Sequence, residues 1–343
     1  MEDQNLIGIF EIAKLAGVGP SAVANWRKRS PDFPRPVADL KSGPVFRRGE
    51  IRAWLKRRKR QVAHIISTIN LKGGVGKTTT TVALAEMLSA EFRQKVLVID
   101  LDPQTNATVM LIGEEKWKNL NSKGLTLARL FRDALDGQQQ FDLQQTLQRD
   151  VSNVRDVRSV DLLPSSLDLI DVQDNLASMP SGRYHANIPI EILRRATKSI
   201  IDDYDYVLID CPPNLGIITL NGLRISDGYI IPAIPDILST YGIPQIVTRV
   251  KDFAATIGEQ IEPIGIVISK YDSRGSLHGN TTKRLRQQLK DAPIFDTIVP
   301  YSNKIAEAAE YVLTGTLRQK YGYTGQYDAY RALAAELKKK AEA

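Results

Sequence analysis

Cysteine and long apolar runs are scarce in this 343-residue chain. Cys211 is the one cysteine, so no intramolecular disulfide can form, and with three scattered histidines we expect no zinc site of the usual Cys/His kind. No apolar run approaches the roughly 18 residues of a membrane-spanning helix, and no stretch of the signal-peptide kind follows Met1. These absences favour a reducing, cytosolic setting and predict no membrane partner.

Positive charge is concentrated near the N-terminus. The net charge is +7, and residues 1–60 hold 14 Lys/Arg against 6 Asp/Glu. The remaining residues hold 32 basic and 33 acidic side chains and are therefore close to neutral. The length suits about two domains, and we place them at 1–60 and 61–343. The basic domain predicts contact with nucleic acid or another anionic surface, and a solvated basic tail is the alternative.

Residues 6–60 have the pattern of a compact helical unit. Residues 10–16 and 21–29 predict two short helices separated by a glycine turn, and Pro20 suits the first position of the second helix. Residues 33–37 and 45–48 predict a small hairpin, and a third helix is expected from Glu50. The two tryptophans of this stretch, Trp26 and Trp54, are expected in its core.

This order of elements resembles the winged helix-turn-helix of the MerR and excisionase kind. The resemblance implies that the second helix enters the major groove of DNA and that the hairpin contacts the phosphate backbone. The side chains it places against DNA are Ser21, Asn25, Arg27 and Lys28 for the groove, and Arg47 and Arg48 for the phosphates. A small helical interaction domain with solvated charge is the alternative.

A glycine-rich loop between a strand and a helix predicts a phosphate site. Residues 65–69 form an apolar run typical of a buried strand, and residues 80–88 have the apolar positions of a helix packed on a sheet. Between them lie Lys72, Gly73, Gly74, Val75, Gly76, Lys77, Thr78 and Thr79. Glycines allow backbone N–H groups to approach phosphates at a helix N-terminus. Lys77 is expected at the β- and γ-phosphates and Thr78 at Mg²⁺.

From residue 62 onward, apolar runs alternate with helical segments. Strands are predicted at 63–69, 95–100, 160–163, 205–210, 228–232, 263–268 and 295–299. Because these runs are continuously apolar, they are typical of parallel strands that are covered on both faces. We therefore predict an α/β fold with a doubly wound, mostly parallel sheet, and ligands at the carboxyl ends of its strands. Residues 114–158 are polar and are expected to form helices and loops outside the sheet.

Acidic residues follow two of these strands. Asp102 lies in the segment 98–106, and Asp210 closes the run 206–210. A carboxylate that ends an apolar strand beside a phosphate loop is the arrangement in which Mg²⁺ or its waters are held, and we assign that role to Asp210. The alternative reading of a lone strand-end aspartate is a helix cap.

The loop pattern K-G-G-x-G-K-[ST] resembles the deviant Walker A box of the ParA/MinD family of dimeric ATPases. Residues 100–106 match the family's D-x-D-P-Q-x-N box, and residues 210–213 match its D-x-P-P box. The resemblance implies ATP and Mg²⁺ as cofactors and a Lys72 that crosses to the ATP of the other subunit. It also implies that Asp102 orients the attacking water. Position 105, commonly Gly in the family, is Thr here, and we expect a local adjustment of this switch.

A weaker match spans residues 298–308, which resemble the family segment I-P-x-x-x-x-[RK]-x-x-E-A. The resemblance implies that Pro300 lies near the adenine and that basic residues there bind DNA without sequence preference. The candidates are Lys304 and, less directly, Arg274, Lys283, Arg284 and Arg286. An ordinary solvated helix face is the alternative for these charges.

The resemblance as a whole implies a partition ATPase that dimerises on ATP and binds DNA at the nucleoid. Its weak hydrolysis would be stimulated by a centromere-binding partner of the ParB type, and its basic domain would repress its own operon. A nucleotide-gated transcription regulator that moves no cargo is the second hypothesis. Membrane positioning and a metabolic kinase are disfavoured, because the C-terminal helix lacks a bulky apolar face and no second substrate site is evident.

Overall fold

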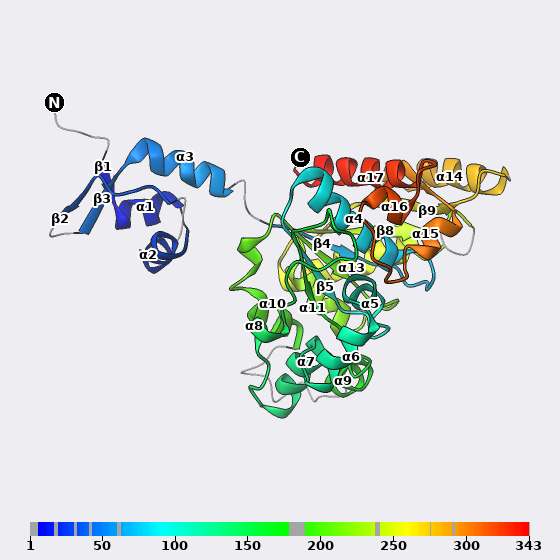
Figure 1. Ribbon diagram of the computed structural model, residues 1–343, viewed down its shortest axis with the longest axis horizontal. Coiled ribbons are helices and arrows are strands. Elements are labelled where there is room, and N and C mark those ends of the chain that lie inside the picture. The colour runs from blue at the N-terminus through cyan, green and yellow to red at the C-terminus, as the bar shows by residue number, and fades with distance from the viewer. Residues whose placement is uncertain are drawn as a thin grey trace. The chain divides into compact units, whose positions relative to one another are not determined.

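A computed structural model describes residues 6–16, 20–30, 33–40, 43–59, 63–177, 189–236, 241–274, 276–289 and 292–342. The chain divides into two compact units, residues 1–62 and 63–343 (Figure 1). Across these described ranges, no helix combines the length and the apolar character needed to cross a membrane.

The first unit joins three helices to a three-stranded antiparallel sheet. The strands lie in the order β1-β3-β2, and the helices carry the apolar residues that cover them. Their bounds are β1 Leu6–Gly8, α1 Ile9–Ala16, α2 Pro20–Arg29, β2 Ala38–Leu40, β3 Gly43–Arg47 and α3 Arg48–Lys59. Trp54 is buried, and its ring lies 5.6 Å from that of the half-buried Trp26, as the sequence predicts. The predicted turn at 17–19 lies outside the described residues.

The hairpin of the first unit differs from the prediction. The strand expected at 33–37 forms later, as β2, and it pairs with β3 through Ala38, Asp39 and Leu40. Pro34 and Pro36 explain the shift, because proline has no N–H to donate to a strand ladder. Phe33 instead turns inward, with its ring 4.8 Å from that of Trp54.

The second unit is built on a seven-stranded sheet, and every pair of neighbouring strands in it is parallel. The strand order is β10-β9-β8-β4-β7-β5-β6, which confirms the predicted α/β fold. The bounds are β4 His64–Thr68, β5 Val96–Asp100, β6 Val160–Leu163, β7 Tyr206–Asp210, β8 Gly228–Ala233, β9 Glu262–Tyr271 and β10 Ile294–Pro300. All residues of β5 and β7 are buried, so the side chains on both faces of the sheet are shielded from solvent there.

Helices cover both faces of this sheet (Figure 1). One apolar cluster contains side chains of α4 Lys77–Phe92, α5 Asn106–Ile112, α16 Leu317–Tyr321 and α17 Gln326–Ala341. The cluster on the other face contains side chains of α7 Leu127–Asp136, α9 Leu169–Ala177, α10 Ile192–Thr197, α11 Ile217–Ile225 and α13 Ile243–Ile257. The sheet is therefore doubly wound, and its strands run continuously apolar because neither face meets solvent.

The other helices of the second unit range from three to 13 residues. They are α6 Glu114–Ser122, α8 Leu143–Thr146, η1 Pro189–Glu191, η2 Ile201–Asp203, α14 Ser276–Gln288 and α15 Asn303–Glu307. The polar stretch 114–158 forms α6, α7 and α8 with connecting loops, outside the seven strands, as predicted.

A buried ionic cluster joins α4 to α16. The Lys320 ammonium lies 2.8 Å from the Glu86 carboxylate and 2.7 Å from the Asn153 side-chain oxygen. The Tyr321 hydroxyl donates to the other oxygen of Glu86 at 2.7 Å. Because Lys320 and Glu86 are both buried, the pair ties α16 to α4 without competition from water.

Candidate nucleotide site

The glycine-rich loop connects β4 to α4 at the carboxyl edge of the sheet. Gly74 and Gly76 have φ angles of 75° and 90°, a left-handed region in which a Cβ is unfavourable. Gly76 stands at the N-cap of α4, and the helix begins at Lys77, which is only 6% exposed. The loop thus presents backbone N–H groups and a buried ammonium to the same space, as a phosphate cradle requires.

A cavity of about 380 Å³ opens against this loop. It is lined by loop and helix residues Gly73, Gly74, Gly76, Lys77, Thr78 and Thr79, and by Asp102, Gln104, Asn106, Val109, Met110, Pro213, Lys270 and Ala309. Six of the eight predicted loop residues and Asp102 therefore meet at one site, whereas Lys72 and Val75 are not among the lining residues. Pro300, which ends β10, is not one of these lining residues.

Thr78 and Asp210 form the pair that would hold a divalent cation. The Thr78 hydroxyl donates to one carboxylate oxygen of Asp210 at 2.7 Å, and the Thr81 hydroxyl lies 3.4 Å from the other. Asp210 is fully buried, and desolvation raises the pKa of its carboxyl to about 7. A buried carboxylate beside a hydroxyl offers the hard oxygen donors that Mg²⁺ prefers, and a cation there would relieve the desolvation. The residues present therefore fit Mg²⁺.

Asp100 is a buried member of the site that the sequence argument missed. It ends β5 and stands in register with Asp210 on β7, so two carboxyl groups share one buried edge. Burial and then the charge of Asp210 raise the pKa of Asp100. One Asp100 oxygen accepts hydrogen bonds from the Thr108 N–H at 2.9 Å and the Thr108 hydroxyl at 2.7 Å. The signal was present in the sequence, because parallel strand ends meet at one edge of a sheet.

Asp102 lies two residues further on and lines the cavity. Its carboxylate accepts the Gln104 N–H at 2.9 Å, and its own carbonyl oxygen accepts the Ser165 hydroxyl at 2.7 Å. Desolvation raises the pKa of the Asp102 carboxyl. These contacts fix Asp102 on the wall of the cavity that the loop also lines.

Thr105 stands in the first switch segment with φ 57°, at the N-cap of α5. This is left-handed backbone, which is unfavourable for a β-branched residue and free for glycine. The expected local adjustment is thus a strained Thr105 within an otherwise intact segment. The following helix begins one residue later, at Asn106.

Lys72 directly precedes the first glycine of the loop, and its side chain is partly exposed. Its ammonium is 3.5 Å from the Asp236 carboxylate, and its N–H donates to the Asn70 side chain at 2.9 Å. Asp236 follows β8, so the loop and the neighbouring strand end are in contact within one chain. Lys72 is not one of the residues that line the cavity.

The candidate DNA-binding residues belong to several helices and loops of the two units. Arg274 makes a double hydrogen bond with Asp272, at 2.9 and 2.7 Å, and lies on the surface. Lys304 pairs with Glu307 at 3.2 Å on α15. In the first unit, Arg27 lies 3.7 Å from Asp39.

The other candidates of the first unit lie on α2 and around the start of α3. Arg47 lies 3.6 Å from Glu50 with most of its side chain exposed, and Arg48 begins α3. Ser21, Asn25 and Lys28 lie on α2, and their side chains fall outside the described residues.

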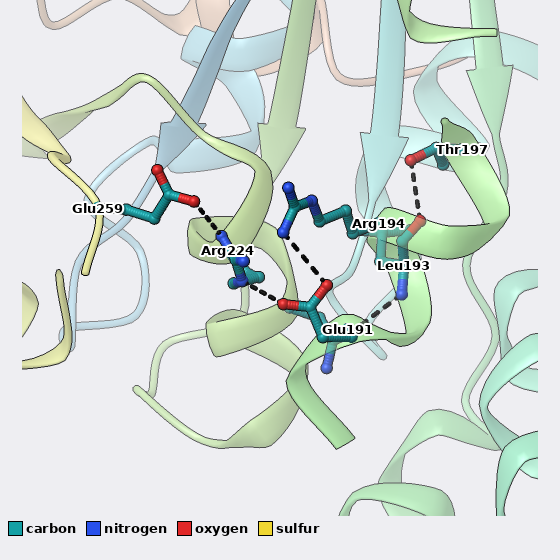
Figure 2. A network of polar contacts seen from close by, with 7 residues as sticks. Glu191, Leu193, Arg194, Thr197, Arg224 and Glu259 are labelled. Atoms are coloured by element: carbon teal, nitrogen blue, oxygen red, sulfur yellow. Dashed lines mark hydrogen bonds and ion pairs between the residues drawn. The ribbon is translucent and has the colours of Figure 1, made fainter. Parts of the chain in front are cut away.

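A second cavity, of about 510 Å³, lies at the opposite edge of the sheet, where β4, β8 and β9 begin. Figure 2 shows its main side chains. Arg224 donates to Glu191 and, at 3.0 Å, to Glu259, and Arg194 lies 3.4 Å from the same Glu191. Because Glu191 and Glu259 pair with the Arg224 guanidinium, we interpret this cluster as a structural contact that joins α10, α11 and the end of α13.

The model of the AAA domain family AAA_31 matches residues 63–263, more than half of the chain. The chain belongs to this family. A Pseudomonas putida protein without a described function is 34% identical over 276 residues, which cover 80% of this chain and 95% of the relative. The chromosome partitioning protein ParA of Caulobacter vibrioides is 28% identical over 72% of this chain and 84% of its own length. The sporulation initiation inhibitor protein Soj of Bacillus subtilis is 29% identical over 72% and 88%.

Solved structures of the same fold hold nucleotides. A Mycobacterium smegmatis protein described as cobyrinic acid a,c-diamide synthase, with ADP and magnesium, matches with a TM-score of 0.60 and 25% identity, over 80% of this chain and 93% of that one. A Borrelia burgdorferi protein described as a plasmid partition protein, with AMPPNP, matches with a TM-score of 0.55 and 22% identity, over 81% and 99%. The chain is thus a P-loop ATPase of the AAA_31 family that is similar to ParA and Soj, and ATP with Mg²⁺ suits its cradle.

Proposed function

We propose that this protein is a DNA partition ATPase that binds ATP, dimerises and then binds DNA. The observation that carries the proposal is a loop with two lysines, Lys72 and Lys77, beside the Thr78–Asp210 pair. Relatives named for chromosome and plasmid partition support the same reading.

Nucleotide binding is assigned to the loop. Gly73 to Thr79 would hold the phosphates with Lys77, and Thr78 with Asp210 would hold Mg²⁺, which supplies charge neutralisation at the phosphates when bound. Asp102 would orient a water and accept its proton. Burial raises the pKa of the Asp102 carboxyl, which makes the carboxylate a better proton acceptor. Pro213 would meet the terminal phosphate, because it lines the same cavity.

Dimerisation is assigned to Lys72. Its position at the mouth of the loop, with 42% of the side chain exposed, supports a role between subunits. To reach a second nucleotide, the ammonium would have to leave Asp236. The ion pair between Lys72 and Asp236 is of modest strength, because both side chains are partly exposed.

DNA binding is assigned to basic residues on both units. Lys304 and Arg274 would contact phosphates on the ATP-bound dimer, and Arg27 and Arg47 would contact an operator through the first unit. A centromere-binding protein of the ParB type would then stimulate hydrolysis and release the DNA. Through this cycle the protein would be associated with the nucleoid.

A nucleotide-gated transcription regulator is the second candidate. It is favoured by a separate first unit with three helices, a small antiparallel sheet and an exposed Arg47. In that case the ATPase unit would gate dimerisation and would need no DNA surface of its own.

Binding to a random-sequence duplex distinguishes the two. Full-length protein is measured with no nucleotide, ADP or ATP–Mg²⁺, beside the variants Arg27→Ala/Arg47→Ala and Arg274→Ala/Lys304→Ala. The partition reading predicts ATP-dependent binding that is lost in the second variant and kept in the first. The opposite pattern would favour the regulator. Binding that ignores the nucleotide in all three proteins would contradict both.

A further inference from the structure

We propose that Lys270 is a nucleotide-binding residue, a third lysine of this site that comes from a distant strand and contacts a phosphate oxygen of the bound nucleotide. The inference rests on the proposed function only in taking ATP as the ligand. Lys270 lies near the end of β9 and lines the same cavity as Lys77 and Thr78.

Two consecutive residues of β9 hold two consecutive carbonyl groups of the loop. The Lys270 ammonium donates to the Gly74 carbonyl oxygen at 2.7 Å, and the Ser269 hydroxyl donates to the Val75 carbonyl oxygen at 2.6 Å. Ser269 is buried, whereas Lys270 is exposed. The serine therefore anchors the loop from inside, and the lysine approaches it from the open side of the cavity.

The backbone of Lys270 is left-handed, with φ 49°. Residues with a Cβ are unfavourable there, and such residues concentrate at ligand sites, where the surrounding structure holds them in place. Here the conformation occurs within the strand that delivers the ammonium to the loop. Glycine or asparagine would adopt this backbone conformation at a lower cost in free energy than lysine does. The lysine side chain is therefore expected to have a role of its own.

The positive charge of Lys270 can explain its presence at this position. An ammonium has three N–H donors, and the Gly74 carbonyl takes one of them. Asp272, two residues along, is taken by Arg274 in two hydrogen bonds, and Asp102 is a carboxylate on the cavity wall. A polyphosphate brings several negative charges into this space. Lys270 can keep the loop carbonyl and direct another N–H to a phosphate oxygen, which gives a charge-assisted hydrogen bond.

The test is a titration of the full chain with ATP–Mg²⁺, and with inorganic tripolyphosphate as a competitor that lacks the base. Lys270→Met removes the charge and keeps most of the side-chain volume. We expect it to weaken both ligands about ten-fold at about 0.1 M salt, because one charge-assisted hydrogen bond is lost. Lys270→Arg restores a cation and should recover most of the affinity.

Ser269→Ala is the matched control, because it removes the neighbouring loop contact without removing a charge. The deficit of Lys270→Met should shrink at about 1 M salt, where screening acts within about 3 Å, whereas any deficit of Ser269→Ala should persist. Wild-type affinity in Lys270→Met would overturn the inference. So would a deficit that salt does not change and Arg does not restore, because Lys270 would then only position the loop. If the wild type binds neither ligand, the proposed function falls as well.

Discussion

The two units of this protein use charge in opposite ways. In residues 63–343, charged groups such as Lys77, Asp100 and Asp210 are buried beside the loop, and their positions are fixed by neighbouring strands and helices. In residues 1–62, ion pairs such as Arg27–Asp39 and Arg47–Glu50 lie at the surface with long contacts of 3.7 and 3.6 Å. Buried charges hold a small ligand in one geometry, whereas exposed charges suit a long polyanion that is bound mainly through its field.

The largest effect in this comparison is expected at Asp102. Asp102→Ala removes a proton acceptor held at the phosphate end of the cavity and should lower the kcat of ATP hydrolysis by about 10²- to 10⁴-fold. ATP affinity should change little, so that an ATP-bound dimer accumulates. Steady-state phosphate release and equilibrium nucleotide binding give the two numbers. Normal turnover would remove Asp102 from the reaction.

Breaking a buried charge pair far from the ligand should affect stability strongly. Lys320→Met leaves Glu86 buried without its ammonium, and we expect a loss of about 3–5 kcal/mol in the free energy of unfolding. Chemical denaturation followed by circular dichroism measures it. A matched control is Lys304→Met, which breaks an exposed pair with Glu307 and should cost less than about 1 kcal/mol. Equal losses would mean that burial does not set the contribution of these charges.

A smaller effect is expected at Thr105. Thr105→Gly removes the strain of left-handed backbone, which costs on the order of 1–3 kcal/mol, but it also gives the unfolded chain more freedom, worth about 0.5–1 kcal/mol. We therefore expect a gain in stability of about 1 kcal/mol, with nucleotide binding kept. Thr105→Ala, which keeps a Cβ at this position, should not show the gain. A clear loss of stability in the glycine variant would show that the Thr105 side chain supports the switch.

The smallest effect on the fold is expected at the exposed pairs of the first unit. Arg47→Ala should change the free energy of unfolding by less than about 0.5 kcal/mol, because its partner Glu50 also lies in water. If Arg47 contacts DNA phosphates, the same variant weakens DNA binding and lowers its dependence on salt. A large loss of stability would mean that the first unit also depends on fixed charges.

The sheet and the loop were predictable because the signal is local. Continuous apolar runs gave all seven parallel strands, and the glycines with Lys77 gave the cradle between β4 and α4. The hairpin is predicted less well, because the apolar pattern around Phe33 favours a strand at residues 33–37, although Pro34 and Pro36 cannot donate to a ladder.

Other parts of the site were not predictable from local pattern. Lys270 is 196 residues from Gly74 in the sequence, and only the order of the strands brings β9 to the loop. The same holds for Asp100. Its pairing with Asp210 depends on which strands are neighbours, and β5 lies next to β7 although the residues that end them, Asp100 and Asp210, are 110 positions apart in the chain.

The proposed role of Lys72 distinguishes a nucleotide site that is completed by a second subunit from one that works within a single chain. The most direct measurement is the molar mass in solution, by light scattering, of wild type, Asp102→Ala and Lys72→Ala, each with ATP–Mg²⁺ and with ADP. We predict a dimer for the first two with ATP–Mg²⁺, a monomer for all three with ADP, and a monomer for Lys72→Ala throughout, although it still binds nucleotide. A Lys72→Ala protein that dimerises with ATP as the wild type does would contradict the account.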